Sequence, residues 1–302
     1  MKTRPIALLL AASLVLTLAG CGKVDPDTQA SPDPGAQETQ ASTPYDPRGT
    51  VLVDRDGLTV TLDEFRPHDD GTLDLELDLE NSGNRDLSVS AANCSVNGYM
   101  AGVFFSCDVP AGGHAYEQAL VIYIDDLTEL GVTDVVDVAL CFSLDTVDGS
   151  HTTVNAAITY PNAALYDYSS SLLQKALANP QWAADGGYQL LLAATEDLYD
   201  QDGVSLLTAC VLSTPFGTRQ LRLELDNRTG ERTVVALGDV TVNGQTVYQG
   251  NLARCAIEPR KRYLTSIDLD YLLDQTGLEG EDKLLEVGLT VNDVPVTVSV
   301  PG

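Results

Sequence analysis

The chain has 302 residues, of which 44% are hydrophobic, and its 17 Lys and Arg stand against 44 Asp and Glu, a net charge of −27. A body this acidic repels nucleic acid and anionic lipid surfaces, which excludes both as electrostatic partners. The apolar content is sufficient for buried cores, and the length exceeds that of a typical single domain, which predicts two domains.

Residues 1–20 have the pattern of an export signal. Lys2 and Arg4 form a positive start, and the apolar run Ile6–Leu18 is shorter than the roughly 20 residues that a membrane-spanning helix needs. The sequence Leu18-Ala19-Gly20-Cys21 resembles the lipobox of bacterial lipoproteins. The resemblance implies cleavage before Cys21 and a diacylglyceryl group on its thiol, and the loss of Lys2 and Arg4 would take the net charge to −29. The alternative is an ordinary secretory signal followed by a chance cysteine.

Residues 21–49 are predicted to form a disordered tether. They are rich in Pro, Gln, Thr, Ser, Ala and Asp and hold almost no large apolar residue, so they cannot bury a core. Acyl chains on Cys21, each contributing roughly 0.8 kcal/mol per buried methylene, would anchor the protein to the outer face of a membrane. The membrane is therefore the first expected partner, through the lipid on Cys21.

The remaining cysteines argue against a disulfide framework. Five are left once Cys21 carries lipid, and an odd number cannot pair completely, so at least one free thiol or intermolecular bond is expected. These cysteines are Cys94, Cys107, Cys141, Cys210 and Cys255. The chain has no CxxC pair and its three histidines are far apart, so no metal or other cofactor is expected.

The body of the chain contains an internal repeat. Shifted by 146 residues, Leu52–Gly98 lies over Leu198–Gly244 without a gap. The matches are alternating leucines, such as Leu75, Leu77 and Leu79, together with Asp-Gly and Asn-Gly pairs. Alternation indicates strands with one buried face, and Asp-Gly and Asn-Gly pairs favour tight hairpin turns.

After the second turn the two copies match more loosely. Each is predicted to be interrupted by a short helical turn, at Asp125–Leu130 and at Tyr271–Thr276. With strands of five to eight residues between turns, the pattern predicts an all-β fold. It consists of two tandem immunoglobulin-like β-sandwich modules of about seven strands each, at residues 50–162 and 184–302.

A helical linker is predicted between the modules, at residues 163–183. The apolar residues of Leu165–Ala178 recur at roughly helical spacing, and Asn179-Pro180 ends the pattern. Trp182, the one tryptophan, follows directly. It is expected to pack at the junction between the modules, and the alternative is an aromatic contact with a ligand.

The chain resembles a group of clostridial-type surface lipoproteins of unknown function. Besides the lipobox, the likeness is carried by the ladder Leu75–Asn81 and the turn Ser95-Val96-Asn97-Gly98-Tyr99. It implies a signal peptide and lipobox, a polar tether and immunoglobulin-like modules, and it covers most of the first module and the second more loosely. It implies no catalytic residue.

No catalytic motif accompanies this architecture. The chain lacks Gly-x-Ser-x-Gly, Ser-x-x-Lys and His-Glu-x-x-His, and Cys107 with His114 is explained by chance proximity around a loop. The pairs Asp54 and Asp56, and Asp200 and Asp202, are weak calcium candidates. Each pair precedes a glycine but lacks the later acidic ligand of a calcium loop, so an Asp-Gly turn is the simpler explanation.

The expectation is a non-enzymatic, lipid-anchored protein on the extracytoplasmic face of the cell membrane. Its modules would present loops or sheet edges to a protein, peptide or glycan partner, by analogy with other sandwich proteins. One alternative is an envelope enzyme or enzyme accessory with carboxylates dispersed along the acidic strands. The adjacent pair Asp125-Asp126 is not expected to be catalytic, because its carboxylates favour the start of a helical turn. The other alternative is a passive structural spacer.

Overall fold

A computed structural model describes residues 46–194, 198–248, 253–270 and 284–301. All described residues belong to one compact unit, Pro44–Gly302. The signal peptide, Cys21, most of the tether and the helical turn expected at Tyr271–Thr276 lie outside the described residues. The last tether residues already contact the body, since the Gly49 amide donates to the Leu62 carbonyl at 2.7 Å.

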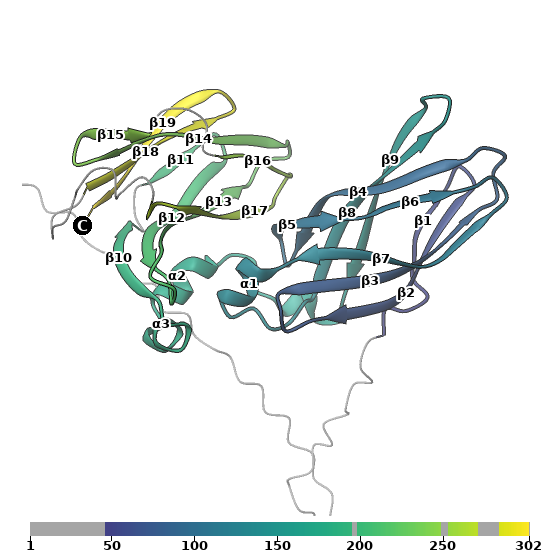
Figure 1. The fold of residues 1–302 in the computed structure, drawn as a ribbon, viewed down its shortest axis with the longest axis horizontal. Coiled ribbons are helices and arrows are strands. Elements are labelled where there is room, and N and C mark those ends of the chain that lie inside the picture. Colours follow the sequence, from purple (N-terminus) through teal and green to yellow (C-terminus); the bar gives the residue numbers. More distant parts are fainter. Residues whose placement is uncertain (1–45, 195–197, 249–252, 271–283, 302) are drawn as a thin grey trace, which may run out of the picture. The chain divides into compact units, whose positions relative to one another are not determined.

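The described chain is all-β apart from short helices, and its first half forms one sandwich (Figure 1). Its elements are β1 (Val51–Arg55), β2 (Leu58–Pro67), β3 (Thr72–Asn81), β4 (Leu87–Val96), β5 (Tyr99–Phe104), β6 (Ser106–Val109), β7 (His114–Tyr123), α1 (Asp125–Glu129), β8 (Asp137–Thr146) and β9 (His151–Thr159). One sheet has the order β1-β2-β3-β7, and in the other β9-β8-β4 continues into β5 and β6. This order is that of an immunoglobulin-like Greek key.

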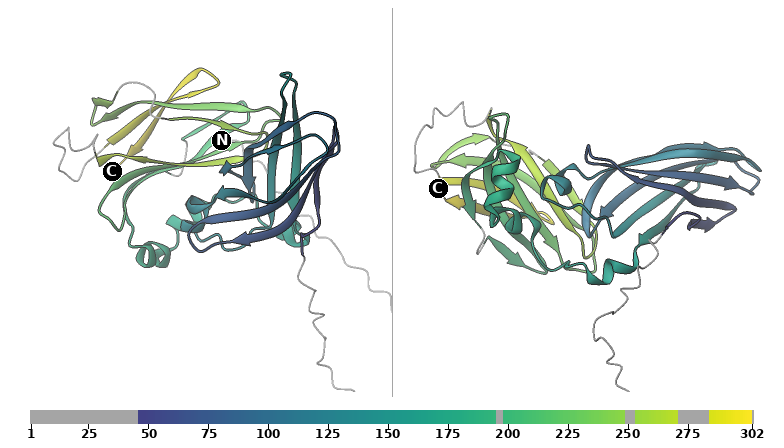
Figure 2. Two further views of the ribbon diagram at one scale, coloured as in Figure 1. Left: turned by 45° about the vertical axis from the view of Figure 1, so that its right-hand side comes forward. Right: turned by 90° about the horizontal axis from the view of Figure 1, so that it is seen from below.

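The second sandwich repeats this order. Its strands are β10 (Gln189–Ala194), β11 (Tyr199–Gln201), β12 (Val204–Ser213), β13 (Arg219–Asn227), β14 (Thr233–Val242), β15 (Gln245–Tyr248), β16 (Ala253–Ile257), β17 (Arg262–Asp268), β18 (Leu284–Val291) and β19 (Val294–Pro301). One sheet runs β11-β12-β13-β17, with β10 on the same edge as β11, and the other joins β15 and β16 to β14-β18-β19. Strands β12 and β14 start and end 146 residues after β2 and β4, which confirms the repeat. In the first module β5 pairs with β7 as well as with β4 and so joins the two sheets, which Figure 2 shows from two further directions.

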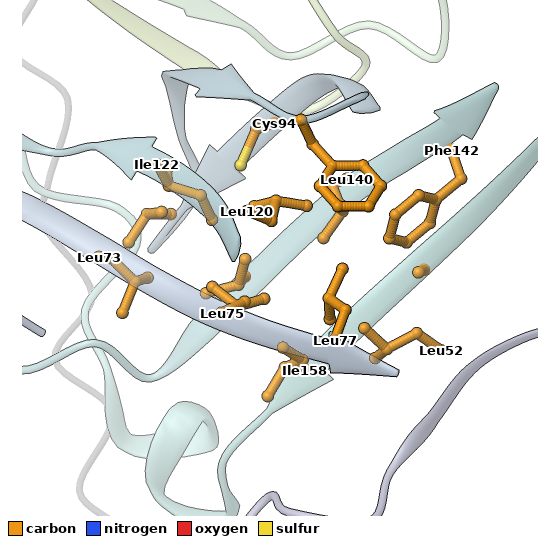
Figure 3. Packing of buried hydrophobic residues seen from close by; sticks show 14 of the residues in the cluster. Leu52, Leu73, Leu75, Leu77, Cys94, Leu120, Ile122, Leu140, Phe142 and Ile158 are labelled. Carbon is orange, nitrogen blue, oxygen red and sulfur yellow. The ribbon is translucent and has the colours of Figure 1, made fainter. Parts of the chain in front are cut away.

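The core of the first module lies between its two sheets. Leu73, Leu75 and Leu77 of β3 are fully buried beside Leu120 and Ile122 of the neighbouring strand β7, and they face Leu140, Phe142 and Ile158 of the other sheet (Figure 3). The polar residues between these leucines point outward and are partly exposed. The predicted alternation is therefore confirmed, because each strand places successive side chains on opposite faces.

The predicted turns are also confirmed. Asp56, Asn97, Asp202 and Asn243 all have positive φ, between 49° and 54°, and each is followed by a glycine with positive φ. Two left-handed residues in succession give a hairpin turn whose twist matches the flanking strands. The equivalent turns have the same conformation in both modules.

The linker differs from the single helix expected over Leu165–Ala178. It consists of the 3₁₀ turn η1 (Pro161–Leu165), α2 (Leu172–Leu177) and α3 (Pro180–Gly186). Residues 166–171 are not helical, because the Asp167 carboxylate accepts hydrogen bonds from the amide and hydroxyl of Ser169. Such local side-chain bonds compete with the helical pattern.

Candidate functional site

The junction between the modules buries charged side chains. In the first module the outward residues Glu76 and Asp78 of β3 are partly exposed, whereas their equivalents Arg222 and Glu224 of β13 are 6% and 0% exposed. The outer face of β13 is covered, since Glu224 contacts both the linker and Tyr99 of the first module. The same strand pattern thus has a solvated outer face in one module and a buried one in the other.

The Glu224 carboxylate is the centre of a hydrogen-bond network. Its Oε1 accepts from the Tyr99 hydroxyl at 2.7 Å. Its Oε2 accepts from the Ser171 hydroxyl at 2.5 Å and from the Leu173 amide at 2.9 Å. Ser171 also caps the start of α2. Burial, and next the Glu224 carboxylate, raise the pKa of Tyr99, so this hydroxyl remains a donor at neutral pH.

Arg262 closes the same junction from β17. Its guanidinium donates to the carbonyls of Ser170 and Ser169 at 2.5 and 2.9 Å, and its Nη1 lies 3.7 Å from Glu224. Its backbone amide donates to the Gly98 carbonyl at 2.9 Å, and a parallel bridge pairs it with Tyr99. Arg262 therefore contacts both modules and the linker and holds them together.

A second contact lies beside α1. Arg222 pairs with Glu129 at 2.5 Å, and its guanidinium lies 5.2 Å from the centre of the Tyr188 ring. Trp182 stacks on Tyr188 and donates its indole N–H to the Glu129 carbonyl at 2.6 Å. Trp182 therefore packs at the junction, as its position in the sequence predicts. Burial, and next the nearby Asp125, raise the pKa of Asp126 to about 6.

An open cavity of about 500 Å³ lies beside Arg262. It is lined by Asn97, Gly98, Tyr99, Tyr168, Ser169, Leu207, Asp226, Asn227, Arg228, Arg260 and Arg262. Eight of the 17 Lys and Arg, but only five of the 44 Asp and Glu, fall between residues 219 and 262. This concentration of cationic residues is visible in the sequence and indicates the position of the cavity, although it matches no motif.

The weak calcium candidates lie on two hairpin turns. Asp54, Asp56, Asp200 and Asp202 are all exposed, and Asp200 forms an ion pair with Arg228. Within the described ranges, no group of three or more His, Cys, Asp and Glu has an arrangement that could hold a metal ion. The left-handed φ of Asp56 and Asp202 explains both Asp-Gly pairs as turns. Cys21, the predicted lipid site, lies outside the described residues.

The five later cysteines are all free thiols. Burial raises the pKa of Cys94 and Cys210 to about 12 and that of Cys255 to about 11, so these thiols are inert at neutral pH. Cys107 contacts the Asp108 carbonyl, whereas the His114 ring stacks on Tyr116, so their contacts do not join them as a nucleophile pair.

One cluster has the composition of a hydrolase triad. On the exposed edge of the first module, Ser143 lies 3.4 Å and Asp145 2.7 Å from His151. Both contacts are to Nδ1 of the same ring, whereas a triad needs one nitrogen for the nucleophile and the other for the carboxylate. The His151 and Asp145 side chains are also more than half exposed. This geometry does not activate a nucleophile.

Comparison with known proteins does not assign the chain to a family. No family model matches the chain. No curated protein matches it either.

In the described part of the chain, no helix has the length and apolar character needed to cross a membrane.

Several solved structures are similar at low identity. The YadV chaperone is 11% identical, with a TM-score of 0.25, over 82% of this chain and 98% of the chaperone. The Salmonella enterica SafA pilin in complex with the SafB chaperone is 11% identical, with a TM-score of 0.24, over 81% of this chain and 97% of that one. Red sea bream transglutaminase is 11% identical, with a TM-score of 0.22, over 82% of this chain and 31% of the enzyme.

Proposed function

We propose that this chain is a non-enzymatic, lipid-anchored protein of the extracytoplasmic membrane face, whose two β-sandwich modules bind a protein, peptide or glycan partner. The anchoring is supported by the sequence alone: an apolar run too short to span, the lipobox-like residues before Cys21, and the polar composition of residues 22–49.

The binding role is supported mainly by the buried junction at Glu224. A passive spacer needs two stable modules but has no need to fix one against the other. Here a fully buried carboxylate and Arg262 hold both modules and the linker, and the cavity beside them draws Tyr99 from one module and Arg260 from the other. A cavity assembled from two fixed modules is preorganised, which reduces the entropy lost on binding.

Metabolic labelling with radioactive palmitate tests the anchoring. The full chain should carry label and sediment with membranes, whereas Cys21→Ala should carry none and appear in the soluble extracytoplasmic fraction. Unlabelled wild-type chain would contradict the anchoring, whatever the modules bind.

Capture from envelope extract tests the binding role. The immobilised chain should retain a saturable partner, and Tyr168→Ala, which removes an exposed ring from the cavity, should lose it. Tyr116→Ala removes an exposed ring outside the cavity and serves as the matched control. Retention of no saturable partner of any class, with no ligand-induced rise in melting temperature, would favour the passive spacer instead.

A further inference from the structure

The turn that leads into β17 matches the turn that leads into β7. The Lys261 amide donates to the Glu258 carbonyl at 3.1 Å, and the Gly113 amide donates to the Pro110 carbonyl at 3.0 Å. The carbonyls of Lys261 and Gly113 both accept, at 2.9 Å, from the asparagine that ends the neighbouring strand. Arg260 therefore occupies the position of Gly112.

This position requires left-handed backbone in both modules. Gly112 has φ of 64° and Arg260 has φ of 58°. Glycine adopts this conformation freely, whereas a side chain with a Cβ is strained there. Among the described residues Arg260 has no ion pair or hydrogen bond of its side chain that would offset the strain. Strained residues of this kind concentrate at functional sites.

The two other cavity arginines also belong to the second module alone. The amides of Arg228 and Ser82 make equivalent 2.8 Å bonds to Gly203 and Gly57, so Arg228 stands where the first module has Ser82. Arg262, the first residue of β17, stands where β7 begins with His114. All three positions around one cavity have thus become arginine in one copy of the repeat.

The three arginines differ in how exposed they are to a ligand in the cavity. Arg262 is buried and held by Tyr99 and two linker carbonyls, and the carboxylates of Glu224 and Asp226 lie 3.7 and 3.6 Å away and compensate its charge. The Arg228 side chain is half exposed, and its ion pair is with the exposed Asp200. Arg260 is exposed and unpaired among the described residues. Arg260 is therefore available to a ligand, and Arg228 can reach one by exchanging its exposed ion pair with Asp200.

We propose that this cavity binds the oxyanion, carboxylate or phosphate, of a small acidic ligand. Arg228 and Arg260 contact the oxyanion, because the planar guanidinium fork matches both groups. The exposed face of Tyr168 packs on the rest of the ligand, and about 500 Å³ suits a molecule of disaccharide size. The inference deepens the proposed function, and rests on it, by naming the ligand class.

The net charge of −27 opposes this binding only weakly. At physiological ionic strength the Debye length is about 8 Å, so carboxylates farther away are largely screened. The immediate surroundings decide the outcome, and there three arginines line the cavity with one carboxylate, Asp226, which lies 3.6 Å from Arg262. Affinity should fall as salt rises, because Arg228 and Arg260 are exposed.

Calorimetric titration of the full chain tests the proposal. The probes are inorganic phosphate and D-glucuronate, with glucose as the neutral comparison. Binding of phosphate alone assigns a phosphate ligand, and binding of glucuronate alone assigns a carboxylate. Glucose should not bind. If neither anion binds the wild-type chain, or if glucose binds equally well, the proposal is wrong.

Arg260→Gly restores the residue of the first module and separates a binding role from a structural one. It should weaken anion binding about tenfold and leave the melting temperature unchanged or higher, because strain is relieved. Arg228→Ser should weaken binding similarly. Arg85→Ser removes an exposed arginine of the first module and is the matched control. Arg260→Gly with undiminished binding would overturn the proposal, while absence of lipid on Cys21 would affect only the anchoring.

Discussion

At the scale of single residues, Glu224 shows what surroundings do to a carboxylate. An isolated buried charge costs several kcal/mol, so its burial requires donors on both oxygens. Tyr99, Ser171 and the first amides of α2 provide these donors, with Arg262 nearby. Its repeat equivalent Asp78 accepts from the exposed Glu117 amide and stays near solvent.

Glu224→Gln should be strongly destabilising. The amide nitrogen would face groups that are themselves donors, and Arg262 would lose one of its two carboxylate neighbours. The expected loss is about 3 kcal/mol of unfolding free energy, measured by urea titration. Asp78→Asn at the equivalent site is the control and should lose less than about 1 kcal/mol. Equal losses in the two variants would contradict the assigned role of Glu224.

Asp126 should make stability depend on pH. Its pKa is raised from 3.8 to about 6 in the folded protein, chiefly by burial. Between these values the folded state holds a proton that the unfolded state has lost, so stability falls as pH rises from 4 to 6. The penalty is complete above pH 6 and amounts to about 3 kcal/mol at most.

Asp126→Asn should therefore be more stable than wild type at pH 7.5 and equally stable below about pH 4. Urea unfolding at the two pH values measures the difference. The same difference between variant and wild type at both pH values would show that the asparagine acts through packing and not through the proton.

At the scale of secondary-structure elements, each module is locked by one buried asparagine. Asn81 Nδ2 donates to the carbonyls of Arg85, Val109 and Pro110. Asn227 makes the equivalent bonds to Glu231, Ile257 and Glu258. Each side chain joins the end of one strand, β3 or β13, to the turn that follows that strand and to the turn that leads into the neighbouring strand, β7 or β17. The repeat therefore preserves a tertiary contact as well as the pattern of leucines.

Asn81→Ala and Asn227→Ala should each cost about 1 to 3 kcal/mol, because buried carbonyls lose their donor. The losses should be similar, since the contacts are equivalent, and urea unfolding measures them. Asn84→Ala, at an exposed position of the same turn as Asn81, should change stability by less than about 0.5 kcal/mol. A neutral effect of either buried asparagine would contradict the role given to the pair.

At the scale of the whole molecule, the junction makes residues 46–301 more than two modules in series. Strand β5 begins in contact with β17, and the linker fills the outer face of β13. Trp182 lies within this junction and is the one tryptophan of the chain, so its fluorescence reports on the junction alone. Wild-type protein should show coincident unfolding by fluorescence and by far-UV circular dichroism.

Arg222→Met should separate the two signals. It removes the ion pair with Glu129 and the contact with the Tyr188 ring, so the fluorescence transition should move to lower urea than the loss of β-structure. Arg66→Met, which removes an ion pair on the first module away from Trp182, should leave the signals coincident. Coincident transitions in Arg222→Met would show that the junction does not unfold separately.

The sequence alone determined the features that depend on local geometry. Period-two leucines specify strand faces, Asp-Gly and Asn-Gly specify turns that require positive φ, and the shift of 146 residues specifies two copies of one sandwich. Each of these signals is complete within a few neighbouring residues or within the comparison of two segments. The lipid site at Cys21 remains a prediction of the same kind.

Only the tertiary structure decided where charge is buried and where the cavity lies. Glu76-Leu77-Asp78 and Arg222-Leu223-Glu224 look alike as strand sequences, yet the second pair of charges is buried because a linker and another module cover it. The sequence predicts a longer linker helix than the structure contains. The hydrogen bonds from Ser169 to the Asp167 carboxylate compete with the helical pattern over residues 166–171. Arg228, Arg260 and Arg262 meet at one cavity because the turn after β13 and the turn before β17 converge there, and contacts between distant segments leave no period in the sequence.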